Sequence, residues 1–144
     1  MTNGFLQPAD SPFSSAFDSN QPHSVTIVVC SSCRRAADPH DLPRPGALLA
    51  RNTAQAAANS GLRVQQVGCL GNCKRGLSAA ILREGCWSYV FGELSPDSAA
   101  DLIAGAELFA RSTDGFMPFR NRPESLKRGL IARVPVYDSL KEVP

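Results

Sequence analysis

The sequence predicts an α/β fold made of a βαβ unit, a β-hairpin and a carboxyl-terminal helix. Residues 25–29 form a β-branched run that is too short for a helix and is typical of a strand buried on both faces. Residues 62–67 alternate apolar and polar side chains, which indicates a second strand. Later in the chain, apolar residues recur at the spacing of one helix face: Ala99, Leu102, Ile103, Ala106 and Phe109.

The segment between the first two strands is predicted to be a helix over residues 45–60. It is rich in alanine and leucine, Pro45 suits the first turn of a helix, and Gly61 is placed to end it. A right-handed crossover connection of this kind joins parallel strands. We therefore expect the first two strands to run parallel in one sheet.

A hairpin and the last helix complete the predicted domain. Residues 78–82 and 87–91 are strand-like and flank a short turn that contains Gly85, the pattern of a β-hairpin. Ser95 followed by Pro96 is a good cap and first-turn pair for the helix that comes next.

Composition divides the chain into three parts. Residues 1–23 are rich in Ser, Pro, Asn and Gln without any period, so we predict a disordered leader with too little apolar surface to offset the entropy of ordering. Residues 24–112 carry the predicted domain. Residues 113–144 hold Gly, Pro and Arg among scattered apolar residues, and we expect an irregular basic extension packed on the domain.

The totals are those of an ordinary soluble protein. A chain of 144 residues suits one domain with a real core, and a formal charge of +2 is too small to indicate nucleic acid. The amino terminus lacks the features of a secretory signal, and no apolar run is long enough for a bilayer. We therefore expect a cytoplasmic protein without membrane attachment, where five cysteines favour metal ligands or redox groups over disulfides.

Four of the five cysteines form two pairs, each placed just after a predicted strand. Cys30 and Cys33 follow the first strand, and Cys69 and Cys73 follow the second. Because the carboxyl ends of parallel strands lie at one edge of a sheet, the four thiols are expected to meet there. Four thiolates bind either a zinc ion or an iron–sulfur cluster, and glycines in the second loop let it bend around such a ligand.

Several motifs between residues 25 and 136 carry a family resemblance: Val29-Cys30-Ser31-Ser32-Cys33-Arg34, Cys69-Leu70-Gly71-Asn72-Cys73-Lys74-Arg75-Gly76, Trp87-Ser88-Tyr89-Val90-Phe91-Gly92, Asp114-Gly115, Arg122-Pro123 and Arg133-Val134-Pro135. They resemble a bacterial family of predicted metal-binding proteins of unknown function, related to the thioredoxin-like [2Fe–2S] ferredoxins. The resemblance implies a thioredoxin-like ferredoxin domain and an association with cobalamin biosynthesis. It also implies a cluster bound by four residues, Cys30, Cys33, Cys69 and Cys73.

Three functions remain open at this point. The first is a ferredoxin-like electron carrier with a [2Fe–2S] cluster, a protein redox partner and no enzymatic activity of its own. The second is a zinc protein with a structural or metal-handling role, because the spacing of Cys30 and Cys33 is shorter than in thioredoxin-like ferredoxins and also resembles zinc sites. The third is a thiol oxidoreductase that uses this pair, which is weaker because prolines separate it from the next helix.

The remaining candidate residues have less specific signals. Cys86 falls at the hairpin turn and is expected to be a packed or surface thiol, with a substitute ligand as the alternative. His23 and His40 are expected to be exposed, although His40 is close enough in sequence to the first cysteine pair to be a further donor.

Basic residues flank the cysteines and recur in the tail. Those beside the two pairs could tune a cluster or bind an acidic redox partner: Arg34, Arg35, Lys74 and Arg75. The tail carries a loose group that we interpret as a solvated face rather than a nucleic-acid site: Arg120, Arg122, Lys127, Arg128 and Arg133. A homodimer is also compatible with the sequence.

Overall fold

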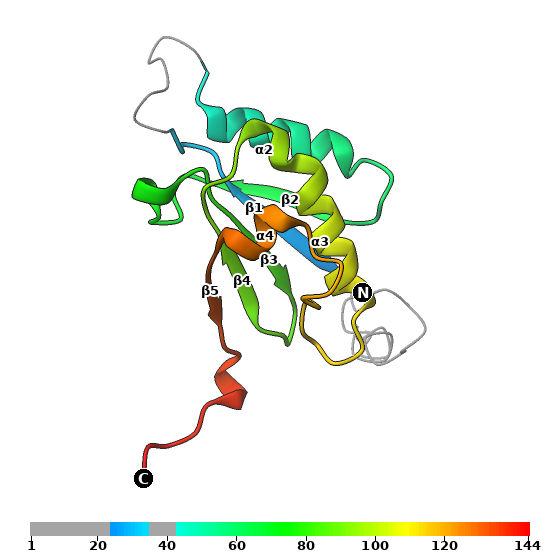
Figure 1. The fold of residues 1–144 in the computed structure, drawn as a ribbon, viewed down its shortest axis with the longest axis vertical. Coiled ribbons are helices and arrows are strands. Elements are labelled where there is room, and N and C mark those ends of the chain that lie inside the picture. The colour runs from blue at the N-terminus through cyan, green and yellow to red at the C-terminus, as the bar shows by residue number, and fades with distance from the viewer. Residues whose placement is uncertain (1–23, 35–42) are drawn as a thin grey trace, which may run out of the picture.

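The computed structural model describes residues 24–34 and 43–144, and its centre is a five-stranded mixed sheet. The strands are β1 (Val25–Cys30), β2 (Arg63–Val67), β3 (Ala79–Arg83), β4 (Ser88–Phe91) and β5 (Leu130–Val134). The helices are α2 (Pro45–Ala56), α3 (Ala99–Arg111) and α4 (Glu124–Arg128), and 3₁₀ turns cover Cys73–Arg75, Pro96–Ser98 and Tyr137–Ser139. The order of strands across the sheet is β2-β1-β3-β4-β5 (Figure 1).

The βαβ unit predicted from the sequence is present. Strands β1 and β2 are parallel neighbours, and Cys30 at the end of β1 pairs with Val67 at the end of β2. Helix α2 makes the crossover and packs against both strands. Strands β3 and β4 form the predicted hairpin, and β3 runs antiparallel to β1. The prediction of an α/β fold is therefore confirmed.

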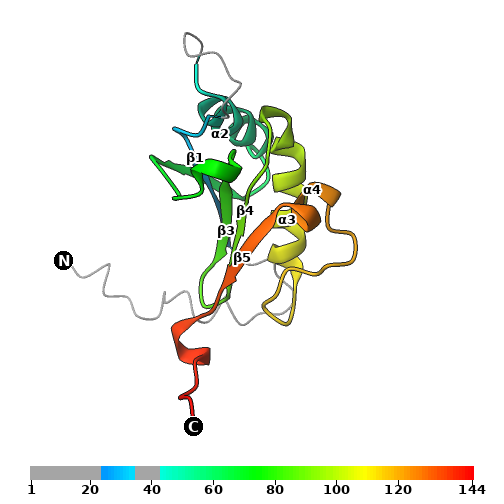
Figure 2. The same ribbon diagram turned by 60° about the vertical axis from the view of Figure 1, so that its left-hand side comes forward.

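The helices lie on one side of the sheet, as Figure 2 shows. On β1, Val25, Ile27 and Val29 have no exposed surface and belong to the core between sheet and helices. Phe109 of α3 meets the ring of Tyr89 of β4 edge-on, with ring centroids 5.3 Å apart. This single apolar layer holds the two parallel strands in place, so their carboxyl ends have fixed positions at one edge of the sheet.

Helix α2 ends at Ala56, four residues before the predicted end at Ser60. The Ser60 hydroxyl accepts a hydrogen bond from the Leu62 N–H at 3.1 Å, so local turn bonds replace helical ones. Gly61, with φ of 81°, then turns the chain into β2. In the described part of the chain, no helix has the length and apolar character needed to cross a membrane.

The expectation of an irregular tail after residue 112 is wrong. Helix α4 packs against α3, and β5 pairs with β4 in antiparallel orientation, with a bulge between Val90 and Phe91. A five-residue helix and a five-residue edge strand are too short to show a clear period in the sequence, since much of β5 is exposed. The predicted leader, residues 1–23, lies outside the described residues.

Arg122 is another correction, because it is buried rather than part of a solvated face. Its side chain is 8% exposed and donates hydrogen bonds to the carbonyls of Met117 at 2.6 Å and Pro118 at 3.1 Å. Its guanidinium group also lies 5.6 Å from the ring centroid of Tyr89 and 5.4 Å from that of Phe119. The residue therefore fixes the path of the tail over the core.

Candidate metal centre

The inner pair of cysteines, Cys30 and Cys33, closes the carboxyl end of β1 and is buried. The Cys30 N–H donates to the Ser78 carbonyl at 3.0 Å, which anchors this end of β1 to the residue before β3. The Gly46 N–H at the start of α2 donates to the Cys33 carbonyl at 3.0 Å. A Cβ atom on Gly46 would come within 3.0 Å of the Cys33 Cβ, so glycine is what allows α2 to pack this closely on the turn.

The pKa values of the two inner thiols are shifted in opposite directions. Burial opposes a charge on Cys30, but the Leu70 N–H and the Cys33 thiol donate to its sulfur, so the pKa of Cys30 lies below its ordinary value. Burial, the hydrogen bond to Cys30 and the charge on Cys30 together raise the pKa of Cys33 to about 11. The two thiols therefore titrate as a coupled pair, in which Cys30 loses its proton before Cys33.

The outer pair, Cys69 and Cys73, lies in the loop after β2 and is exposed to solvent. The two Sγ atoms are 3.8 Å apart, and the Gly71 N–H donates to the Cys69 Sγ at 3.2 Å. Gly71 adopts a φ of 77°, a conformation that favours glycine, and this turns its N–H towards the sulfur. The charge of a metal-bound thiolate is stabilised by such N–H donors.

The two loops are hydrogen-bonded to each other. Both the N–H and the hydroxyl of Ser31 donate to the Val67 carbonyl, at 2.9 Å and 3.1 Å. The Ser32 hydroxyl donates to the Gly68 carbonyl, and Arg44 in turn donates to the Ser32 carbonyl at 2.9 Å. The turn of the inner pair is thereby tied to the chain that leads into the outer pair, as the parallel strands predict.

The sulfurs of the two pairs also affect each other. The Cys30 thiol lies 3.8 Å from the Gly68 carbonyl, at the entrance to the outer loop. The hydrogen bond and the charge of Cys69 raise the pKa of Cys73, and the charge of Cys30 contributes in the same direction. Nevertheless, residues 24–34 and 43–144 contain no group of three or more His, Cys, Asp or Glu side chains placed to hold one metal ion. The structure thus presents two adjacent thiol pairs rather than a closed set of four ligands.

The donor set fits a thiolate-bound metal. With metal–sulfur bonds of about 2.3 Å, two sulfurs of a tetrahedral site are about 3.8 Å apart. The outer pair has this separation, 3.8 Å between the Sγ atoms of Cys69 and Cys73. A tetrahedral zinc ion and a tetrahedrally coordinated iron of a cluster both suit this geometry, so the distance indicates a metal chelate without selecting the metal.

The other candidate donors are not part of this arrangement. Cys86 lies in the turn between β3 and β4 and is partly buried against the core. Strand β3 begins at Ala79 near the cysteine pairs, and Cys86 follows its other end. A Cβ atom on Gly115 would be 3.4 Å from its sulfur. His23 and His40 lie outside the described residues, so the prediction for them is not tested.

The basic residues beside the pairs differ in their surroundings. Lys74 is exposed, and Arg75 forms an ion pair with Glu93 at 3.3 Å between Nε and Oε2. Arg34 is partly buried, and Arg35 lies outside the described residues. Exposed ion pairs of this kind are weak, so the bond to Glu93 does little to fix the Arg75 side chain.

Sequence reasoning missed several residues that shape the site. The hydroxyls of Ser31 and Ser32 connect the loops, and Gly46 makes room for the turn. The Asn72 side chain also donates a partly buried hydrogen bond to the Ser78 hydroxyl at 3.0 Å. A signal was present, because the serines and the asparagine lie inside or beside the two cysteine motifs. Their partners depend on which loops meet, which the sequence pattern alone does not give.

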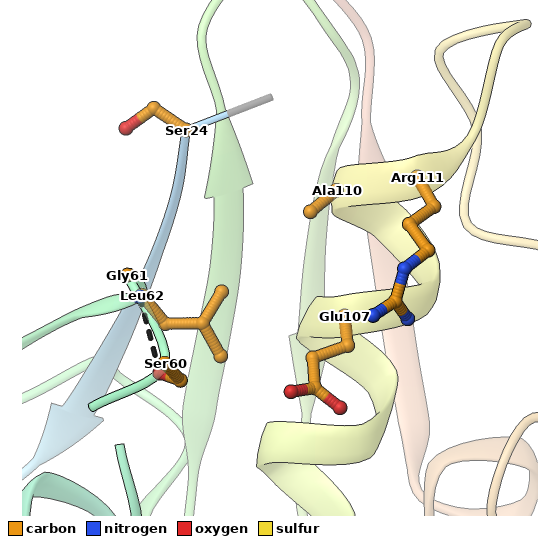
Figure 3. A pocket seen from close by; sticks show the side chains of 7 residues that line it. All are labelled: Ser24, Ser60, Gly61, Leu62, Glu107, Ala110 and Arg111. Carbon is orange, nitrogen blue, oxygen red and sulfur yellow. Dashed lines mark hydrogen bonds between the residues drawn. The ribbon is translucent and has the colours of Figure 1, made fainter. Parts of the chain in front are cut away.

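A pocket of about 350 Å³ lies at the opposite end of the sheet (Figure 3). It is lined by residues before β1, before β2 and at the end of α3: Ser24, Ser60, Gly61, Leu62, Glu107, Ala110 and Arg111. Because β1 begins beside this pocket and ends at Cys30, the pocket and the cysteine pairs are separate features of the molecule.

Comparison with known proteins agrees with the fold. Residues 27–136 match the model of a family described as "Protein of unknown function (DUF1636)". The structure of a thioredoxin-like [2Fe–2S] ferredoxin from Aquifex aeolicus aligns with 77% of this chain and 93% of its own, at 14% sequence identity and a TM-score of 0.50. A structure of the wild-type thioredoxin-like [2Fe–2S] ferredoxin from the same organism covers 76% and 98%, at 13% identity and a TM-score of 0.48. No curated protein matches the sequence. The predicted thioredoxin-like fold is confirmed.

Proposed function

We propose that this chain, which belongs to the DUF1636 family of proteins of unknown function, is a metal-binding protein that carries a [2Fe–2S] cluster. In this proposal it transfers electrons as a ferredoxin-like carrier. The proposed ligands are Cys30, Cys33, Cys69 and Cys73. The observation that carries the proposal is the pairing of two thiol motifs by hydrogen bonds between their loops, from Ser31 to Val67 and from Ser32 to Gly68.

The two pairs would have different roles around a bound cluster. The buried inner pair sits on β1 and the start of α2, so it offers rigid attachment with little access for water. The exposed outer pair faces solvent, so it is the side from which a partner can approach. A bound [2Fe–2S] cluster would accept and release one electron, and the Gly71 N–H at 3.2 Å from the Cys69 sulfur favours the more negative, reduced form.

The partner, compartment and pathway belong to the proposal. Lys74 and Arg75 border the exposed outer pair, so a partner with an acidic surface would be attracted to it. We propose a cytoplasmic carrier that works with such a protein partner and has no independent catalytic activity. A homodimer and a place in cobalamin biosynthesis are expectations from the sequence.

Zinc is the second candidate, because the 3.8 Å separation of the outer sulfurs suits a single tetrahedral zinc ion as well as a cluster iron. In that case the protein would have a structural or metal-handling role.

Metal analysis after anaerobic purification tests the proposal. We expect a brown protein with about two irons and two sulfides per chain and visible absorbance that bleaches with dithionite. A colourless protein with about one zinc per chain and no iron or sulfide would refute the cluster and support the zinc alternative.

Single Cys→Ser variants test the ligand set. Replacement of any of the four paired cysteines is expected to lower metal content, whereas Cys86→Ser, at the far end of β3, keeps it. A thiol oxidoreductase that uses only the inner pair would instead keep its activity in Cys69→Ser and Cys73→Ser.

A further inference from the structure

The two sulfurs of the outer pair lie in contact with each other and are open to solvent. The Sγ atoms of Cys69 and Cys73 are 3.8 Å apart, and both residues are exposed. A disulfide bond has a sulfur–sulfur distance of about 2.05 Å, so the two atoms need to approach by about 1.8 Å. Exposure lets a small oxidant reach either sulfur, and the reactivity of a thiol depends on such access. The outer pair therefore suits reversible oxidation as well as metal binding.

The loop of the outer pair is fixed at one end and open at the other. Cys73 begins a 3₁₀ turn, and the side chain of Asn72 donates hydrogen bonds of 3.2 Å and 3.0 Å to residues that follow it. On the other side, the Cβ positions of Gly68 and Gly71 have no atom within 4 Å beyond the adjoining residues. Cys69, which lies between these glycines, therefore has room to move towards Cys73.

The inner pair does not offer this access. Cys30 and Cys33 are only 2% and 6% exposed. The Cys30 N–H donates to the Ser78 carbonyl, and the Cys33 carbonyl accepts from the Gly46 N–H, both at 3.0 Å. A disulfide reagent has to bring its own sulfur against the attacking thiol, so burial slows the exchange. We therefore expect the outer pair to react first and the inner pair to remain as thiols.

The charges beside the outer pair suit an anionic reagent. Lys74 follows Cys73 directly and is exposed, and the side chain of the next residue, Arg75, is 48% exposed. Glutathione disulfide is a small-molecule disulfide with a net negative charge at neutral pH, because each half carries two carboxylates and one ammonium group. A positive surface raises the local concentration of such an anion.

We propose that Cys69 and Cys73 form a disulfide bond when the metal-free protein meets a small-molecule disulfide, and that this bond prevents metal loading. One thiolate of the pair attacks the reagent and releases one small-molecule thiol, which leaves a mixed disulfide on the protein. The second thiolate attacks the protein-bound sulfur of this mixed disulfide, forms the Cys69–Cys73 bond and releases the second thiol. The two cysteines lose two electrons and two protons, and the small-molecule disulfide gains them.

The disulfide and the metal exclude each other. A metal binds cysteine as the thiolate, and a sulfur in a disulfide carries no such charge. Oxidation of the outer pair therefore removes two of the four proposed ligands, and a bound metal in turn withholds the same sulfurs from oxidation. The inference rests on the proposed function for the identity of the site, and it adds redox control of metal loading.

The test treats the reduced, metal-free, full-length chain with glutathione disulfide and then blocks the remaining thiols with iodoacetamide in denaturant. Trypsin cleaves after Lys and Arg, so it leaves Cys69 and Cys73 together in the peptide of residues 64–74. The inner pair and Cys86 fall in two other peptides. Mass spectrometry without reduction therefore identifies an outer disulfide as the loss of two hydrogens from one peptide. A bond between the pairs, or to Cys86, would join two peptides.

In the wild type, the peptide of residues 64–74 is expected to lose two hydrogens, while the inner pair carries the iodoacetamide label. Zn²⁺ affinity, measured in competition with a chromophoric chelator, should fall by at least about 100-fold because two of four donors are removed, and dithiothreitol should restore it. Cys86→Ser is the matched control and should match the wild type in both measurements. Cys73→Ser should instead keep a glutathione adduct on Cys69, because no second outer thiol displaces it.

The proposal is overturned if the disulfide forms within the inner pair or between the pairs, if no disulfide forms, or if the outer disulfide leaves Zn²⁺ affinity unchanged. A reduced wild type that holds zinc but no iron would end the proposed [2Fe–2S] function, yet the disulfide mapping and the Zn²⁺ competition would still decide this inference. A reduced wild type that binds neither metal would end the proposed function and the redox control together.

Discussion

Gly76 lies directly against the sulfur of Cys33. A Cβ atom on Gly76 would be 2.9 Å from the Cys33 Sγ, closer than real Cβ contacts come. Gly76 has φ of −70° and ψ of 164°, which any residue can adopt, so the need for glycine here is one of space and not of backbone conformation. The loop of the outer pair thus ends by packing on the inner pair.

Gly76→Ala is therefore expected to lower metal content and to destabilise the protein by about 1–3 kcal/mol, because the added methyl group must displace the sulfur or the loop. Gly68→Ala is the matched control, since Gly68 lies at the start of the same loop with nothing within 4 Å of its Cβ position. Metal analysis and urea unfolding of both variants make the comparison. Equal losses in the two variants would contradict a specific contact with Cys33.

The meeting of the two cysteine loops could be predicted because it follows from strand direction alone. Parallel strands place Cys30 and Val67 side by side, and the chain cannot then carry Cys69 far away. The bonds that join the loops could not be predicted, because the acceptors of Ser31 and Ser32 are backbone carbonyls of another segment. Any polar residue in a loop has many such candidates until the tertiary structure selects one.

The metal centre also predicts a pattern of chemical protection. In the metal-free protein, iodoacetamide should modify the exposed outer pair, Cys69 and Cys73, before the inner pair, whose members are 2% and 6% exposed. A bound metal should then slow modification of all four paired cysteines but leave the rate at Cys86 unchanged. Mass spectrometry of digested protein reads each site. Protection of the outer pair alone would remove Cys30 and Cys33 from the ligand set.

The tail shows where sequence patterns fail on short elements. Strand β5 pairs with the edge of β4, with Arg133 opposite Tyr89. The last three residues of β5 are exposed, so no alternation of apolar and polar residues marks it as a strand. Arg122 shows a different failure, in which a charged residue is predicted to be exposed but is buried. Arginine is rarely buried, and here its burial depends on the Met117 and Pro118 carbonyls that accept its hydrogen bonds.

Arg122→Ala is expected to destabilise the protein by about 2–3 kcal/mol. The substitution removes charge-assisted hydrogen bonds to the Met117 and Pro118 carbonyls and leaves these acceptors in a partly buried site. Arg120→Ala is the control, because Arg120 is exposed on the same segment. Urea unfolding of the metal-free protein measures the difference. A result for Arg122→Ala within about 0.5 kcal/mol of the control would show that the buried contacts contribute little.

The stability of the metal-free protein should depend on pH through Cys33. Folding raises the pKa of this thiol from an ordinary value of 9.0 to about 11. Between these values the unfolded chain has released the proton that the folded chain still holds, so stability falls as pH rises from about 9 to about 11. Cys30 acts in the opposite sense, because its lowered pKa adds stability as pH rises towards 9.

The alkaline decline is the part that Cys33→Ala should remove. Urea unfolding of the reduced, metal-free wild type and of this variant, at a series of pH values from about 8 to about 11, separates the Cys33 contribution from the titration of other groups, which the two proteins share. Cys86→Ala should keep the wild-type slope, because Cys86 lies in the hairpin turn away from both pairs. Parallel curves for the wild type and Cys33→Ala would show that Cys33 titrates equally in the folded and unfolded states, and that burial beside Cys30 does not govern its protonation.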